Sequence, residues 1–182
     1  KAENIDTKKI SPNVIQSTID RWKNKGWYPD DVILRKRDPL EKSFLEIYKI
    51  YQSKLINLNS TDFGDLILHC VKIFERNKDI SEIYSKNFKY ILVDEYQDTN
   101  HIQSKWLIYL AKHHGNISCV GDDDQSIYSW RGAEIKNFLE FDKIYKNTKI
   151  IRLEKNYRST QNILSVASKL IENNQSRVGK NL

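Results

Sequence analysis

The chain has 182 residues, of which 39% are apolar, 11% aromatic and 30% charged, and its net charge is +6. This length suits one ordinary domain or two small ones, and the apolar content is too high for a disordered chain. The longest uninterrupted apolar run is Trp106 to Ala111, whereas a membrane-spanning helix needs about 20 such residues. The sequence therefore predicts no membrane span and no membrane partner.

The first half of the chain is predicted to be helical. Ser11 and Pro12 are typical of a helix start and Gly26 of its end, and the apolar stripe between them is Val14, Ile15, Ile19 and Trp22. A second helix is expected from Leu40 to Leu58, with its stripe at Phe44, Tyr48, Tyr51 and Leu55. Asp62 can cap a third helix, whose expected stripe is Phe63, Leu66, Ile67, Cys70, Val71 and Phe74.

The second half alternates strands and helices, which predicts an α/β fold with a parallel sheet. Three strands are expected, at Tyr90–Val93, Ile117–Gly121 and Lys149–Leu153, and three helices at Ile102–Ala111, Glu134–Phe141 and Thr160–Glu172. Polar clusters follow all three strands. Ligands of such sheets bind beyond the carboxyl ends of the strands, so these clusters are the candidate site.

Charge is unevenly distributed along the chain. Residues 94–124 hold six acids and two bases, a net of −4, and residues 142–182 hold nine bases and three acids, a net of +6. This asymmetry suits a site that holds a cation together with a polyanion. The alternative, that the lysine-rich segments are solvated faces, stays open at this point.

Two cysteines, Cys70 and Cys119, lie in apolar stretches without CxxC spacing. We expect two buried, reduced thiols in a cytosolic protein.

Asp94 and Glu95 are adjacent carboxylates at the end of the first predicted strand. One can hold Mg²⁺ while the other faces a reacting water, because magnesium prefers oxygen ligands and keeps several waters. An ordinary acidic pair on the surface is the alternative for an isolated Asp-Glu.

A second cluster follows the second strand. Gln125 offers a neutral amide that can bond a phosphate oxygen or a water. Tyr128 and Trp130 lie next to Arg131, and exposed aromatics beside arginine can stack on unpaired bases. Tyr128 and Trp130 are two positions apart, and this spacing fits one face of a buried strand about as well as it fits an exposed stacking surface.

A third cluster follows the third predicted strand and opens a helix. Arg158 can form a bidentate contact with a phosphate, and Tyr157 can stack on a purine. A helix cap by Ser159 beside a surface ion pair is the alternative reading.

Taken together, these segments resemble superfamily 1 DNA helicases of the UvrD, PcrA and Rep type, with UvrD the nearest branch. Val93–Asn100 (VDEYQDTN) resembles their motif II, Val120–Ala133 (VGDDDQSIYSWRGA) motif III and Leu153–Thr160 (LEKNYRST) motif IV. Thr61–Leu66 resembles a short stretch that precedes motif II in the same proteins. Order and spacing match as well.

The resemblance implies a partial RecA-like parallel sheet, that is, a P-loop NTPase fold without its P-loop strand, with an all-helical insertion in the N-terminal half. Residues 1–60 would be the helical insertion, 61–155 the C-terminal part of the first RecA-like domain, and 156–182 the start of the second.

The resemblance also assigns roles. Asp94 and Glu95 would hold Mg²⁺, and Glu95 would be the base for water attack on the γ-phosphate of ATP. Gln125 would contact that phosphate, Tyr157 the adenine, and Arg158 the transition state. The DNA-binding residues would be Tyr128, Trp130 and Arg131.

The sequence departs from the family because it lacks a phosphate-binding loop and the later motifs V and VI. A phosphate-binding loop reads GxxxxGKS or GxxxxGKT, but the only Gly-Lys pair is Gly179-Lys180, followed by Asn181, and the chain also contains no methionine. We therefore expect an internal segment that by itself hydrolyses ATP negligibly.

The resemblance predicts the central segment of a cytoplasmic, ATP-dependent 3′-to-5′ DNA helicase of repair or replication. Its cofactors would be Mg²⁺ and ATP, and its partners single-stranded DNA, DNA junctions and repair proteins. Two alternatives are the helicase portion of a recombination helicase-nuclease and a non-enzymatic module that binds single-stranded DNA.

Overall fold

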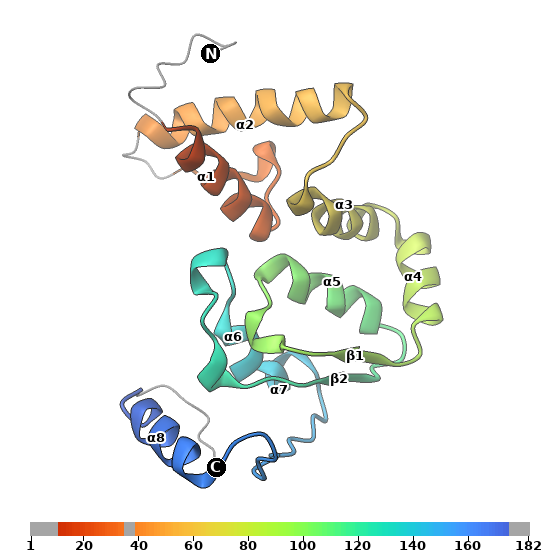
Figure 1. Ribbon diagram of the computed structural model, residues 1–182. Coiled ribbons are helices and arrows are strands. Elements are labelled where there is room, and N and C mark those ends of the chain that lie inside the picture. The colour runs from red at the N-terminus through yellow and green to blue at the C-terminus, as the bar shows by residue number, and fades with distance from the viewer. Residues whose placement is uncertain (1–10, 35–38, 175–182) are drawn as a thin grey trace. The chain divides into compact units, whose positions relative to one another are not determined.

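The computed structural model describes residues 11–34 and 39–174 (Figure 1). Its helices are α1 (Pro12–Asn24), α2 (Pro39–Asn57), α3 (Phe63–Arg76), α4 (Lys78–Asn87), α5 (His101–Ala111), α6 (Ile135–Leu139), α7 (Phe141–Ile144) and α8 (Gln161–Ile171). Its strands are β1 (Ile91–Val93) and β2 (Ile117–Cys119), and its short 3-10 turns are η1 (Pro29–Asp31), η2 (Tyr96–Asp98), η3 (Asp123–Gln125) and η4 (Ser129–Arg131). Within the described ranges, no helix is long and apolar enough to span a bilayer.

The chain divides into two compact units. The first comprises Lys1–Ile91 and Asn100–Ile117, and the second comprises Leu92–Thr99 and Ser118–Leu182. The predicted domain boundaries after residues 60 and 155 rest on the resemblance, and they stay predictions.

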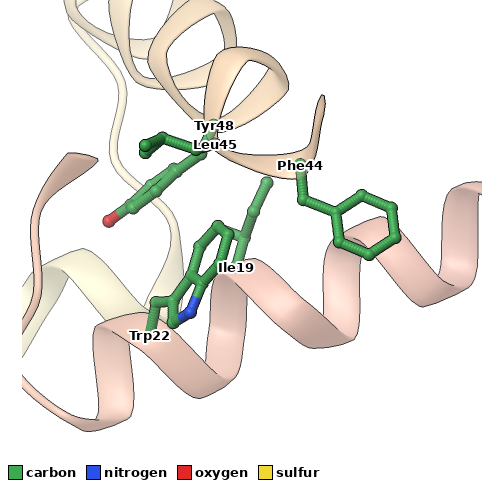
Figure 2. Packing of buried hydrophobic residues seen from close by; sticks show 5 residues of the cluster. All are labelled: Ile19, Trp22, Phe44, Leu45 and Tyr48. Atoms are coloured by element: carbon green, nitrogen blue, oxygen red, sulfur yellow. The ribbon is translucent and has the colours of Figure 1, made fainter. Parts of the chain in front are cut away.

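The first unit has an apolar core between α1 and α2. Figure 2 shows Ile19 and Trp22 of α1 facing three side chains of α2, namely Phe44, Leu45 and Tyr48. The rings of Trp22 and Tyr48 stack with centroids 5.8 Å apart. The helical periodicity that predicted these two faces is confirmed for Ile19, Trp22, Phe44 and Tyr48.

A buried ion cluster joins α1 to the start of α3. Lys23 is fully buried, and its Nζ lies 2.7 Å from Asp62 Oδ2 and 2.8 Å from Asp65 Oδ1. Asp62 also caps α3 by accepting the Asp65 N–H, and it accepts the Tyr51 hydroxyl. Burial alone would raise the pKa of Asp62, but the bonds from Lys23, Asp65 and Tyr51 lower it overall. The carboxylate is thus held in its charged form.

The buried face of α3 differs from the predicted stripe. Leu68, Val71 and Phe74 are buried, whereas Phe63 is 93% exposed and Leu66 is 53% exposed. The prediction was wrong for Phe63, Leu66 and Cys70 because the stripe was drawn from apolar residues alone and left Asp65 out. Asp65 is fully buried beside Lys23. The face of α3 that carries Asp65 is therefore the face that points into the core.

β1 and β2 form a two-stranded parallel sheet, which confirms the α/β class. The N–H of Ile91 donates to the Asn116 carbonyl, and farther along the N–H of Val120 donates to the Val93 carbonyl. Both strands therefore end at the same edge. Asp94-Glu95 and Gly121-Asp122 follow at that edge.

The third predicted strand, Lys149–Leu153, is absent from the described part of the chain, so that prediction was wrong. Ile150, Ile151 and Leu153 are exposed there, and no neighbouring strand supplies ladder hydrogen bonds. A strand needs such a partner whatever its side chains prefer. The predicted helix Glu134–Phe141 forms as two shorter helices, and α4 was not anticipated.

The cysteines do not both lie in the core as predicted. Cys70 is exposed, because it belongs to the outward face of α3, and Cys119 is partly buried. Burial raises the pKa of the Cys119 thiol to about 12.

We expect the two thiols to react with a maleimide at clearly different rates at pH 8. Cys70 is accessible, whereas a pKa near 12 leaves about one Cys119 thiol in 10⁴ as the reactive thiolate. Peptide mass spectrometry after timed labelling measures both rates. Cys70→Ser should abolish the fast phase, and equal rates in the folded wild-type chain would contradict the prediction.

Candidate nucleotide and DNA site

Asp94 and Glu95 extend from the end of β1 into solvent, and both are exposed. Glu95 adopts a left-handed backbone conformation, with φ at 51° and ψ at 41°. Few residues other than glycine do so, and such strain clusters at functional sites. The Glu95 N–H donates to Asp94 Oδ1 at 2.9 Å, which ties the two acids together at the strand end.

Gln97 connects this strand end to the next one. Its amide nitrogen donates to Glu95 Oε2 at 2.7 Å, and its Oε1 accepts the Asp122 N–H at 3.0 Å. Gln97 lies in η2, and its side chain is only 1% exposed. Gln97 stands in the segment that resembles motif II, but no role was predicted for it.

Asp122 organises the loop that follows β2. Its Oδ1 accepts the Asp124 N–H, and its Oδ2 accepts the side-chain amide of Gln125 at 2.7 Å. Gln125 is thereby oriented at the end of η3. The oxygens of Asp122, Asp123 and Asp124 lie within 4.8 Å of one another, but grouped exposed acids are common without a metal.

The oxygen chemistry of Asp94 and Glu95 fits a magnesium ion. Each carboxylate has one oxygen engaged in the bonds described above and a second oxygen on an exposed side chain. Mg²⁺ accepts one or two carboxylates and fills its remaining positions with water and phosphate oxygens. These two residues would therefore be its protein ligands.

An open pocket of about 510 Å³ lies within the second unit. It brings together Gln125 and the segment before α8, and its lining consists of Gln125, Lys155, Asn156, Tyr157 and Arg158. Two cations, two amides and an aromatic ring are the groups that phosphates and a base would contact. The pocket thus unites Gln125, Tyr157 and Arg158, which were predicted to bind the nucleotide.

The segment before α8 is shaped by Asn156. Its Oδ1 accepts the backbone N–H groups of Arg158 at 2.9 Å and Ser159 at 3.0 Å. Lys155 Nζ lies 5.0 Å from the centre of the Tyr157 ring. Lys155 and Asn156 are the lining residues to which sequence reasoning gave no role, although both stand in motif IV.

Tyr128, which directly precedes η4, forms one cluster with Trp130 and Arg131 of η4. The two rings lie 6.3 Å apart, and the Arg131 guanidinium carbon lies 5.4 Å from one and 5.9 Å from the other. Trp130 is 78% exposed, so it is not a core residue. An exposed indole beside a cation can stack on an unpaired base.

Comparisons with known proteins point to one family. A model described as the UvrD/REP helicase N-terminal domain matches residues 1–146. A probable DNA helicase II homolog of Rickettsia conorii is 47% identical over the whole chain, the DNA helicase II of Haemophilus influenzae 45% and the ATP-dependent DNA helicase PcrA of Bacillus subtilis 44%. The chain covers 28%, 25% and 25% of these three proteins, respectively, or about a quarter of their length.

Proposed function

The chain belongs to the UvrD/REP helicase family, and on that basis we propose that it is the central segment of an ATP-dependent 3′-to-5′ DNA helicase. It would form part of a RecA-like motor that couples ATP hydrolysis to movement along single-stranded DNA. The enzyme would act in the cytoplasm, in DNA repair or replication, on junctions and with repair proteins as partners.

One observation carries this proposal furthest: the pocket that unites Gln125 with Tyr157 and Arg158. Those residues come from motifs about 30 positions apart in the chain, and each had a predicted contact with ATP. Tyr157 would stack on the adenine, while Gln125 and Arg158 would contact the γ-phosphate.

Hydrolysis would proceed by attack of water on the γ-phosphorus. Glu95 would take a proton from that water, and the bond from the γ-phosphorus to the bridging oxygen of ADP would break. Arg158 would stabilise the charge that develops on the phosphoryl oxygens. Mg²⁺ held by Asp94 and Glu95 would neutralise phosphate charge when bound.

The cluster of Tyr128, Trp130 and Arg131 would hold the DNA. Stacking on aromatics tolerates any base, because every base has a π-face, and this suits an enzyme that moves along DNA of any sequence.

We expect Trp130→Ala to weaken binding of an oligothymidylate to the chain by about 5- to 150-fold, which corresponds to about 1–3 kcal/mol for one stacked base. Fluorescence anisotropy of a labelled oligonucleotide at fixed salt measures the affinity. Trp27→Phe, a substitution in the other unit, serves as the matched aromatic control. Equal affinity of wild type and Trp130→Ala would argue against a DNA role for this cluster.

The 182 residues contain no phosphate-binding loop, so we propose that the chain by itself hydrolyses ATP negligibly. The alternative function, a non-enzymatic DNA-binding module, also predicts negligible ATP hydrolysis by the chain. ATP hydrolysis by the product of the whole reading frame would separate the two, because only the helicase proposal requires it. A nuclease domain in the same reading frame would favour the helicase-nuclease alternative.

A further inference from the structure

Gln97 lies between the two strand ends that carry the candidate catalytic groups. Its side chain is 1% exposed and is fixed within the second unit. Its neighbour Tyr96 is fully buried and packs edge-on against Phe141, with ring centroids 5.5 Å apart. The Thr99 carbonyl accepts the Glu134 N–H and the side chain of Asn137. η2 is thus anchored at both ends.

The two bonds of Gln97 suit an amide side chain, which has both a donor and an acceptor. A carboxylate such as Glu95 can only accept, and the Asp122 N–H can only donate. The group between them must therefore donate to one and accept from the other, as an amide does. A carboxylate at position 97 could still accept the Asp122 N–H, but it would repel Glu95.

The connection continues into the loop that bears the aromatic cluster. Asp122, whose backbone bonds Gln97, accepts the side chain of Gln125. Gln125 lines the pocket, and Tyr128 follows three residues later. A contiguous path of hydrogen bonds thus runs from Glu95 to Gln125, close in sequence to the aromatic rings.

Gly121 keeps the space that Gln97 needs. A Cβ atom at position 121 would lie 2.6 Å from Gln97 Oε1 and 2.8 Å from Phe138 Cε2. Both distances are shorter than real Cβ contacts, so any side chain here would displace Gln97 or Phe138. The observed position of the Gln97 side chain therefore depends on the absence of a Cβ atom at position 121.

We infer that Gln97 is a positioning residue that links the DNA-binding loop to Glu95, an inference that rests on the proposed function. DNA stacked on Tyr128 and Trp130 shifts the segment that begins at Gly121. Gln97 passes this shift to the carboxylate of Glu95. It thereby orients that carboxylate toward the attacking water. Contiguous networks of this kind can carry coupling between sites.

The test uses the protein encoded by the whole reading frame and measures ATP turnover with and without single-stranded oligothymidylate. The readout is the ratio of the two rates, because partial unfolding lowers both rates equally and leaves the ratio unchanged. We expect the wild type to be stimulated by DNA. In Gln97→Glu the stimulated rate should fall about 10- to 100-fold, and the ratio should approach one.

Gly121→Ala provides a second route to the same result, because its Cβ would crowd Gln97 Oε1 as well as Phe138 without adding charge. Gln16→Glu on the exposed surface of α1 is the matched charge control and should keep the wild-type ratio. Oligonucleotide affinity should stay within about twofold in Gln97→Glu. A wild-type ratio in both variants, or an equal loss of both rates, would overturn the inference. A wild-type protein that DNA does not stimulate would instead refute the proposed function, and the inference with it.

Discussion

Replacing Lys23 with methionine is expected to lower the free energy of unfolding of the chain by about 3–5 kcal/mol. Methionine keeps the apolar stem but removes the ammonium group, so the fully buried Asp65 loses its ion-pair partner. A buried carboxylate without its cation is far more costly than the same loss at a surface. Urea-induced unfolding followed by tryptophan fluorescence measures the change.

Lys86→Met is the matched control for this experiment. Lys86 pairs with Glu82 at 2.6 Å, but both side chains are more than half exposed. Such a surface pair contributes at most about 1 kcal/mol. If the two variants lost the same stability, the cluster around Lys23 would contribute no more than an ordinary surface pair.

Glu95→Gln is expected to reduce DNA-stimulated ATP turnover of the whole protein by about 10²- to 10⁴-fold, the usual contribution of a general base. Glutamine keeps the size of the side chain, and its carbonyl can still accept the Gln97 amide. The fold and the affinity for oligothymidylate should therefore be unchanged. Steady-state phosphate release measures turnover, and anisotropy measures DNA binding.

Glu46→Gln on the exposed face of α2 should leave turnover at the wild-type value. Wild-type turnover in Glu95→Gln would show that another group activates the water. A parallel loss of DNA binding would point to a structural defect rather than a missing base.

The helices of the first unit could largely be predicted, because apolar residues at helical spacing mark a buried face. The buried face of α3 could not be predicted in this way. Its orientation depends on Asp65 meeting Lys23, a residue 42 positions earlier in the sequence. Local periodicity carries no information on such a long-range ion pair, so a buried charge looks like a surface one.

The candidate site could be predicted where the chemistry lies in short motifs. The strand ends at Asp94 and Asp122 were anticipated, and so was the grouping of Gln125 with Arg158. Lys149–Leu153 was mistaken for a strand because pairing depends on a neighbour that side-chain composition does not reveal. Gln97 was overlooked because its importance comes from being buried between two strand ends, which a linear motif does not express.

The left-handed backbone of Glu95 has a consequence for how variants of this protein would be ranked. Glycine is the residue that this conformation suits best, so Glu95→Gly should be tolerated or even favoured by the fold. A screen that scores abundance would then rate the glutamate as dispensable, whereas a screen that scores activity would rate it as essential. At position 95, selection for stability would favour glycine, whereas selection for activity would favour glutamate.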